Sequence, residues 1–252
     1  MKRRAFCTLA AALATAAGGA AAEESLPDLI ARAKPAVVLV GTYGALDSPK
    51  FSFRGTGFVV GDGLTVVTNA HVIAQPADDT AQRSLAIQVW SAGGGWTLRQ
   101  VKQMSGDPFR DLAVLRVEGD RLPALTLATT PVREGAAIAL MGFPLGGALG
   151  FSHVTHRGIV AARTAIASAA SNFQALNARA LRQLREGSFD ILQLDATAYR
   201  GNSGGPVFDL ASGEVVGVVS MSLAKDTKES ALNSASGISY AIPAADVLRL
   251  LR

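Results

Sequence analysis

The chain has 252 residues, of which 49% are hydrophobic and 17% are charged, and this composition excludes a disordered protein. The length suits one large all-β or α/β unit better than two average domains. The single cysteine, Cys7, excludes an intramolecular disulfide, and only His71, His153 and His156 could join it in a Cys/His metal cluster. We therefore expect neither a metal nor another cofactor.

Residues 1–22 have the features of a signal peptide. Lys2-Arg3-Arg4 precede an apolar Ala/Leu stretch, and Ala20-Ala21-Ala22 form a small-residue cleavage site before Glu23. We expect the remaining residues, 23–252, to be exported to the periplasm or secreted, by the general or the twin-arginine route. The alternative is a retained membrane anchor, but the apolar stretch is short for a membrane span, so we expect no stable span after cleavage.

Removal of this segment changes the charge balance. It takes away three of the 24 basic residues and none of the 20 acidic ones, so the mature chain keeps 21 basic and 20 acidic residues. A chain this close to neutral lacks the excess of basic residues that is typical of nucleic-acid-binding proteins, and we expect no nucleic-acid partner.

Short apolar runs separated by turn signals predict an all-β fold with a helix at each end. A first helix is expected over 25–34, ending before Pro35. The expected strands of the first half are 36–40, 57–60, 64–67, 85–89 and 112–115. Those of the second half are 137–140, 158–160, 191–194, 215–220 and 238–242, followed by a helix over 247–251. The two halves meet near 122–134, and regularly spaced short strands are typical of an antiparallel barrel or sandwich.

One segment departs from this pattern. Thr164 to Glu186 is rich in alanine and has helical periodicity, with arginines at 179, 182 and 185 on one face. We interpret it as a helical insertion in the second half that covers a barrel edge. A regulatory or oligomer contact, or an anion or membrane site at the arginines, remains the alternative.

The segment Gly201-Asn202-Ser203-Gly204-Gly205-Pro206 carries the strongest chemical signal. Glycines around a serine permit a tight exposed turn in which backbone N–H groups converge on one oxygen. A serine hydroxyl is a poor nucleophile without a base that takes its proton. His71, just past an expected strand end, supplies a candidate base.

Two acids, Asp107 and Asp111, could orient this histidine. Asp107 precedes a proline and is typical of a turn, whereas Asp111 begins the apolar strand that would hold it in a buried place. We therefore choose Asp111. The resulting order of histidine, aspartate and serine is that of chymotrypsin-type double barrels.

With these segments in place, the sequence resembles the HtrA/Deg group of trypsin-like serine proteases. The segments that carry the resemblance run in family order over most of the mature chain. They are 55–60 (GTGFVV), 68–72 (TNAHV), 111–115 (DLAVL), 142–146 (GFPLG), 158–160 (GIV), 201–206 (GNSGGP) and 240–243 (YAIP). The resemblance implies a chymotrypsin-like double β-barrel, with a first barrel over about 35–125 and a second over about 130–243.

The resemblance also implies roles for individual residues. Ser203 would be the nucleophile, His71 the general base and acid, and Asp111 the orienting acid. The backbone N–H groups of Gly201 and Ser203 would form the oxyanion hole. Further residues would form the substrate pocket, namely Thr197 at its base and Ser220, Met221, Ser222 and Gly237 along its walls. Without an acid at its base, this pocket favours small or apolar side chains at the P1 position of the substrate.

The implied function is an exported serine endopeptidase that cleaves unfolded or damaged proteins through an acyl-enzyme. Two alternatives are a non-hydrolytic, chaperone-like binding module on the same fold and an esterase acting on non-peptide substrates. Family members often form trimers through the segment before the first strand, so a homo-oligomer is possible.

Two departures from the family pattern affect this expectation. Only nine residues follow Pro243, so we expect no PDZ domain, and regulation through such a domain is in doubt. Tyr199-Arg200 stand where relatives often have Asn-Pro before the serine turn, which could alter the oxyanion hole.

His153 and His156 have only a local interpretation. Three residues apart on a strand, they would point to opposite faces, which favours surface or pocket-lining positions over a shared metal site.

Overall fold

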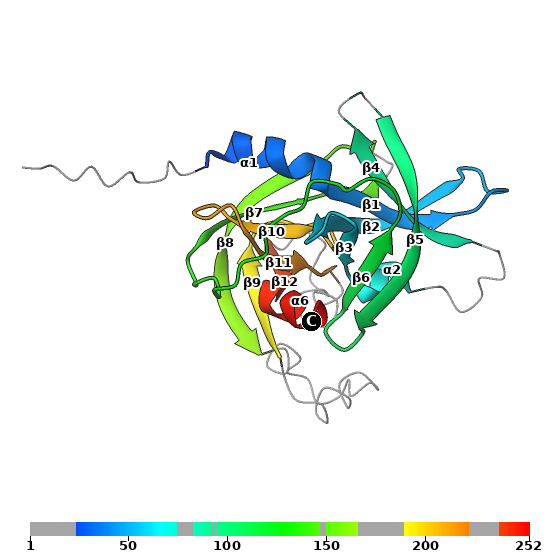
Figure 1. Cartoon of the computed structure of the whole chain (residues 1–252). Helices are drawn as coiled ribbons and strands as arrows, with labels where there is room; N and C mark the ends of the chain where they lie inside the picture. Colours follow the sequence, from blue (N-terminus) through cyan, green and yellow to red (C-terminus); the bar gives the residue numbers. More distant parts are fainter. Residues whose placement is uncertain are drawn as a thin grey trace, which may run out of the picture.

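Two antiparallel β-barrels, each closed by six strands, form the main body of the chain (Figure 1). The structure is a computed structural model, and it describes residues 24–74, 83–91, 93, 95–146, 150–165, 189–221 and 237–252. The segment that we interpret as a signal peptide lies outside the described residues. The double barrel expected from the family resemblance is thus confirmed.

The first barrel has the strand order β1-β2-β3-β6-β5-β4. Its strands are β1 Val37–Tyr43, β2 Phe51–Val60, β3 Thr65–Thr68, β4 Ser84–Ser91, β5 Gly95–Asp107 and β6 Leu112–Val117. The second barrel has the order β10-β11-β12-β9-β8-β7. Its strands are β7 Ala137–Gly142, β8 Val154–Ala165, β9 Asp190–Asp195, β10 Pro206–Asp209, β11 Val215–Val219 and β12 Ile238–Pro243.

Short helices flank the barrels. α1 (Leu26–Ala33) begins at Ser25, whose hydroxyl accepts from the Asp28 N–H, and continues into a 3₁₀ turn, η1 (Lys34–Ala36). Arg32 of α1 pairs with Glu24 at 2.7 Å and donates to the Gly213 carbonyl at 3.0 Å, which ties the helix to the turn between β10 and β11. α2 (Ala70–Ile73) follows β3, and α6 (Ala244–Leu250) follows β12. None of these helices, nor any other in the described residues, has the length and apolarity needed to cross a membrane.

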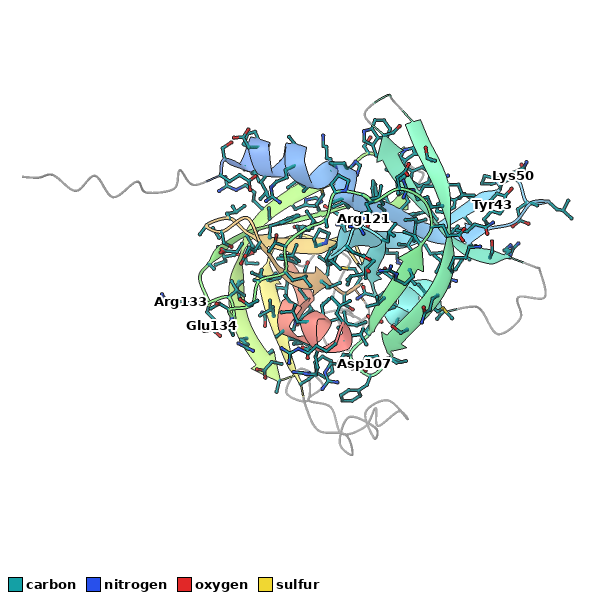
Figure 2. The ribbon with its side chains drawn as sticks, viewed as in Figure 1. Tyr43, Lys50, Asp107, Arg121, Arg133 and Glu134 are labelled. Atoms are coloured by element: carbon teal, nitrogen blue, oxygen red, sulfur yellow. The ribbon has the colours of Figure 1, made fainter. Side chains whose placement is uncertain are left out.

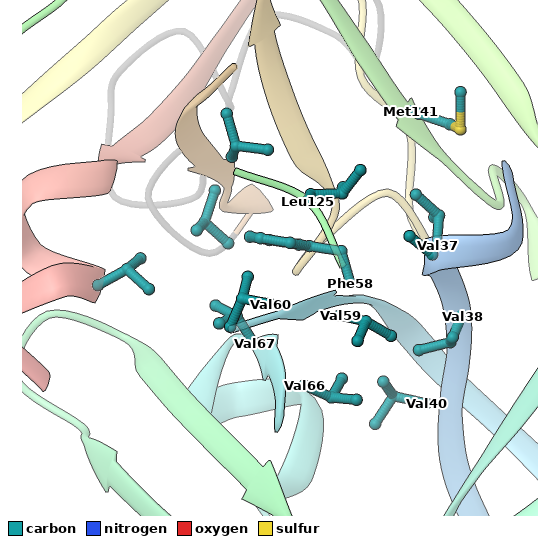
Figure 3. Packing of buried hydrophobic residues seen from close by; sticks show 14 of the residues in the cluster. Val37, Val38, Val40, Phe58, Val59, Val60, Val66, Val67, Leu125 and Met141 are labelled. Atoms are coloured by element: carbon teal, nitrogen blue, oxygen red, sulfur yellow. The ribbon is translucent and has the colours of Figure 1, made fainter. Parts of the chain in front are cut away.

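The segment between the barrels is bound to both of them. Leu125 N–H donates to the Val59 carbonyl at 2.8 Å, and the Ala128 N–H donates to the Val215 carbonyl at 2.9 Å. The side chain of Leu125 enters the core around Phe58 (Figure 3), which also contains Val37 and Val60. The barrels therefore share one apolar core at their contact.

Several elements differ from the sequence prediction. β5 was not expected because its side chains are partly or fully exposed and it has no apolar run. β10 was not expected because it has four residues and begins with proline. The terminal helix begins at Ala244 rather than at Val247.

The helical prediction over 164–186 is wrong at its start. Thr164 and Ala165 belong to β8, where they pair with Ile191 and Asp190 of β9. Pairing across the barrel therefore decides their conformation, over the alanine-rich local sequence. The remaining part of the expected helix, 166–186, lies outside the described residues.

Candidate active site

Asp111 lies in the turn between β5 and β6 and has a left-handed backbone, with φ of 58°. This conformation is uncommon for a residue with a side chain, although aspartate tolerates it better than most. Its carbonyl accepts from the Ala70 N–H at 3.2 Å and from the Asn69 side-chain amide at 2.9 Å. These two bonds connect the strained residue to the start of α2, where His71 is located.

The Asp111 carboxylate faces His71 and is bound from three directions. It accepts from the His71 backbone N–H at 2.9 Å, contacts the ring Nδ1 at 2.8 Å and accepts from the Ser220 hydroxyl at 2.7 Å. Because a carboxylate can only accept here, Nδ1 is the donor of this contact, and in the neutral imidazole Nε2 is then the nitrogen with the lone pair.

Burial and hydrogen bonding act in opposite directions on this carboxyl group. Asp111 is only 3% exposed. Burial by itself raises its pKa, but the hydrogen bond and attraction from His71 and the hydrogen bond from Ser220 outweigh it, so the pKa is lowered. Asp111 therefore stays ionised at neutral pH although it is itself buried, whereas the side chain of His71 is 37% exposed.

Ser203 lies at the contact between the barrels, close to the start of β10. Its hydroxyl oxygen accepts from the Met221 N–H at 3.2 Å, and in the described part of the chain no hydrogen bond joins it to His71. Hydrogen bonds between catalytic groups are often long or poorly aligned before substrate binds. The structure thus brings His71 and Asp111 into direct contact, and Ser203 has a different partner.

The backbone around Ser203 leaves two N–H groups without partners among the described residues. The N–H groups of Asn202, Gly204 and Gly205 donate to the carbonyls of Tyr199, Val219 and Asn202, at 2.9 to 3.0 Å, whereas those of Gly201 and Ser203 have no such bond. Gly201 has φ of 101°, and a Cβ there would lie 2.1 Å from the Phe143 carbonyl oxygen. Only glycine fits this position.

Thr56 was not singled out in the sequence analysis. From the first barrel, this residue holds residues 201–205, the turn that carries Ser203 and that we call the serine turn. Its hydroxyl donates to the Gly201 carbonyl at 2.6 Å and accepts from the Phe143 N–H at 3.2 Å. Its backbone N–H donates to the Ser203 carbonyl at 2.9 Å. The only sequence signal for this role is its place in the 55–60 segment, because its partners lie 87 or more residues away in sequence.

The expected pocket residues are only partly described. Thr197 is half-buried after β9 and Gly237 precedes β12, whereas Ser222 lies outside the described residues. A Cβ at Gly237 would lie 3.8 Å from an oxygen of Asp195, an acid that the sequence analysis did not consider for the pocket.

A further residue missed by sequence reasoning braces the backbone on both sides of Thr197. The buried Ser239 hydroxyl donates to the Ala196 carbonyl at 2.6 Å and accepts from the Ala198 N–H at 2.9 Å. These two bonds fix the backbone at the expected base of the pocket.

A cavity of about 870 Å³ lies beside His71 on the side of the first barrel. Apolar side chains from several elements line most of it, namely those of Ile73, Leu85, Met104 and Phe109. His71 and Asp111 also line this cavity, whereas Ser203 and the expected pocket residues do not, so the hollow adjoins the candidate site on its histidine side.

The other two histidines lie in separate surroundings. The His153 Nε2 is 2.9 Å from the Val37 carbonyl, and its ring stacks on Trp96; burial lowers its pKa. His156 lies beside Tyr199, and burial lowers its pKa as well. The two histidines thus have different neighbours among the described residues.

The sequence pattern of the trypsin-like peptidase domain matches residues 55–218, which includes His71, Asp111 and Ser203. This chain belongs to the trypsin-like peptidase domain family. Its closed double barrel and the segment order found in the sequence agree with that assignment.

Similar proteins place the chain near the HtrA/Deg group, which confirms the resemblance. A probable periplasmic serine endoprotease, DegP-like, from Hahella chejuensis is 32% identical over 202 residues, covering 79% of this chain and 35% of the relative. Serine protease HTRA3 from Rattus norvegicus is 27% identical, covering 90% of this chain and 43% of the relative. The chain thus spans less than half the length of these relatives.

Solved structures with HtrA or Deg names also align with this chain. The HtrA-type protease AlgW with tripeptide aligns with a TM-score of 0.60 and 27% identity, covering 90% of this chain and 62% of that one. The Deg5 structure aligns with a TM-score of 0.60 and 26% identity, covering 88% of this chain and 90% of that one.

Thr56→Val tests the link between the barrels at the serine turn. The variant leaves the Phe143 N–H and the Gly201 carbonyl without their partner, and each buried unpaired group costs about 1–3 kcal/mol. We expect the free energy of unfolding in urea to fall by about 2–4 kcal/mol. Thr97→Val, at an exposed position of β5, is the matched control and should change little. Equal stability of the two variants would contradict this role of Thr56.

Ser220→Ala tests the ionised state of Asp111 through pH. The lowered pKa of Asp111 means that its contribution to stability is present above the ordinary carboxyl pKa and is lost as pH falls through the folded-state value. The variant loses one bond to the charged form, so the pKa in the folded state rises. In urea unfolding between about pH 7 and pH 3, the free energy of unfolding of Ser220→Ala should lie below that of the wild type at neutral pH. This difference should become smaller as the pH falls.

The control for this experiment is Ser84→Ala, because Ser84 is exposed and, among the described residues, its hydroxyl donates to one backbone carbonyl, that of Tyr43 in β1. It should show no pH-dependent deficit. A deficit of Ser220→Ala that is constant across the pH range would mean that the hydroxyl does not act on the Asp111 charge.

Proposed function

We propose that this protein is a serine endopeptidase that works through an acyl-enzyme. Ser203 attacks the carbonyl carbon of a peptide bond while His71 Nε2 takes the hydroxyl proton, and Asp111 stabilises the imidazolium that forms. The protonated His71 then donates to the leaving amine, and water, activated by the same histidine, releases the acyl group. The observation that carries this proposal is the ionised, buried Asp111 bound to His71 Nδ1, because it leaves Nε2 as a base.

The two backbone N–H groups of Gly201 and Ser203 are suited to the oxyanion of the tetrahedral intermediate. Neither has a partner in the described chain, although their neighbours in the turn are paired. Loss of one donor in such a hole typically costs about 100- to 1000-fold in rate. The Thr56 hydroxyl, by holding the Gly201 carbonyl, would keep the Gly201 peptide in the required orientation.

We propose polypeptides, in particular unfolded or damaged ones, as substrates. An extended peptide can pair with the backbone of Ser220 and Met221, which follow β11, and this mode of binding requires a chain that is locally unfolded. The name of the AlgW structure includes a bound tripeptide, and several relatives are named periplasmic endoproteases. Export to the periplasm, directed by residues 1–22, and assembly into a homo-oligomer such as a trimer complete this proposal.

The second candidate is a binding protein that needs activation before it can hydrolyse peptides. The observation that favours it is that, among the described residues, no hydrogen bond joins the Ser203 hydroxyl to His71, although this hydroxyl accepts from the Met221 N–H at 3.2 Å. That bond uses only an acceptor site of the hydroxyl, so activation would have to bring Ser203 and His71 into hydrogen-bond contact. Covalent labelling of Ser203 by a fluorophosphonate distinguishes the two candidate functions.

For the pocket, we propose Thr197 at the base, Ser220, Met221 and Ser222 along one wall, and Gly237 on the other. A base without a charged group favours small or apolar P1 side chains. Asp195, near Gly237, is the acid that could change this preference.

Ser203→Ala and His71→Ala should abolish activity. We would compare the purified full chain and both variants for degradation of reduced, unfolded casein and for covalent labelling by a fluorophosphonate. Loss of such residues typically lowers kcat by roughly a million-fold, so both readouts should fall to background. Ser52→Ala, at an exposed position of β2, should behave like the wild type.

The outcomes of this comparison are distinct. Labelling without casein degradation would indicate a narrow substrate range. Absence of labelling in the wild type would contradict the constitutive protease and favour the activator-dependent binding protein.

Peptides that differ only at P1 test the pocket. Fluorogenic peptides with alanine, valine or methionine at P1 should have a kcat/KM at least about ten-fold above the lysine peptide, because the pocket base lacks a facing charge. Preference for lysine that disappears in Asp195→Asn would overturn this expectation and assign Asp195 to the pocket.

A further inference from the structure

Arg110, the residue before Asp111, is held in a cluster that we call the Arg110 clamp: Arg110 with Asp107, Phe109, Phe189 and Asp246. Its Nη1 donates to Asp107 Oδ2 at 2.8 Å. Its Nε lies 3.2 Å from Asp246 Oδ1, within ion-pair distance although the geometry does not make a hydrogen bond. The guanidinium carbon is 5.5 Å from the Phe109 ring centre and 5.6 Å from that of Phe189.

The clamp joins parts of the chain that are far apart in sequence. Asp107 ends β5 and lies beside α6 in Figure 2, Phe189 immediately precedes β9, and Asp246 is in the first turn of α6. The Phe109 and Phe189 rings pack edge to face, with 5.3 Å between the ring centres. Arg110 therefore ties the turn that carries Asp111 in the first barrel to two elements of the second half of the chain.

Asp246 is an unusual anchor because its side chain is only 8% exposed. Burial raises the pKa of Asp246, and attraction to Arg249 and Arg110 lowers it only in part. Arg249 contacts the same oxygen at 2.6 Å but is itself exposed and belongs to α6. Asp246 would therefore keep one cationic partner if Arg110 were replaced, and the chain should still fold.

The backbone of the turn shows how the clamp could act on the active site. Arg110 N–H donates to Asp107 Oδ1 at 3.1 Å, and Asp111 N–H donates to the Pro108 carbonyl at 3.4 Å. On the other side, Asp111 is held by the start of α2. The peptide group between Arg110 and Asp111 thus fixes the orientation of Asp111, whose backbone is left-handed. The Arg110 side chain connects this peptide group to α6.

We propose that Arg110 is a positioning residue, which fixes the backbone of Asp111 by tying its turn to α6 and so directs the Asp111 carboxylate toward His71. The proposal rests on the proposed protease function. It assigns Arg110 no contact with substrate, and it predicts an effect on turnover greater than any effect on substrate binding.

Arg110→Met and Arg249→Met form a matched pair for the test. Both remove one cationic partner of Asp246, but only Arg110 adjoins Asp111. With a fluorogenic peptide carrying valine at P1, Arg110→Met should lower kcat on the order of ten-fold with little change in KM, because small misplacements of catalytic groups are costly. Arg249→Met should leave both constants near those of the wild type, and Arg110→Lys should restore part of kcat.

A spectroscopic measurement tests the same geometry without turnover. The proton between His71 Nδ1 and Asp111 should give a downfield ¹H NMR signal in the wild type and in Arg249→Met, and a shifted or weakened one in Arg110→Met. Thermal unfolding of each variant checks that it is folded. If Arg110→Met does not fold, Asp246→Asn, which leaves the Arg110–Asp107 pair in place, should still lower kcat and shift the signal.

Two results would overturn the proposal. The first is an equal loss of kcat in Arg110→Met and Arg249→Met that follows their loss of stability. The second is an unchanged proton signal in Arg110→Met. If the wild type neither hydrolyses the peptide nor reacts with a fluorophosphonate, the protease function fails, whereas the proton signal still decides whether Arg110 positions Asp111.

Discussion

The buried carboxylate of Asp111 has to remain charged at the contact between two barrels. The groups around it stabilise this charge by donating hydrogen bonds to it. Burial disfavours the charge, so three hydrogen bonds from His71 and Ser220 have to balance it. His71 in α2 and Asp111 both belong to the first barrel, whereas Ser220 follows the strand β11 of the second. The His71–Asp111 pair therefore forms within one barrel, and only docking of the second barrel adds the hydrogen bond from Ser220.

The same docking contact organises the serine turn. Thr56 of β2 bonds Gly201 and Ser203, which belong to the loop before β10 of the other barrel. A Cβ at Gly204 would lie 2.1 Å from the Thr56 carbonyl, so the two backbones approach as closely as glycine permits. The second barrel thus contributes Ser220 to Asp111, and the first contributes Thr56 to the loop of Ser203, while the apolar core around Phe58 packs at the same contact.

Much of the fold could be predicted because the core strands have continuous apolar runs. β1, β3, β6 and β11 are buried almost throughout, and their sequences show it. β5 escaped prediction because its exposed side chains leave no pattern, and it is held by pairing with β4 and β6 instead. The alanine-rich start of the expected helix, Thr164 and Ala165, became strand for the same reason: its partners on β9 decide its conformation.

The sequence by itself determined the family and the double barrel, and it predicted His71, Asp111 and Ser203 as the candidate catalytic residues, because short motifs with fixed neighbours carry these features. Only the tertiary structure decided that Thr56 supports the serine turn, that Ser239 braces Thr197 and that Arg110 joins Asp111 to α6. Each of these contacts links residues more than 40 positions apart, and a hydrogen bond or ion pair across such a distance leaves no local pattern. The physical reason is that barrel closure and docking, rather than chain proximity, bring these groups together.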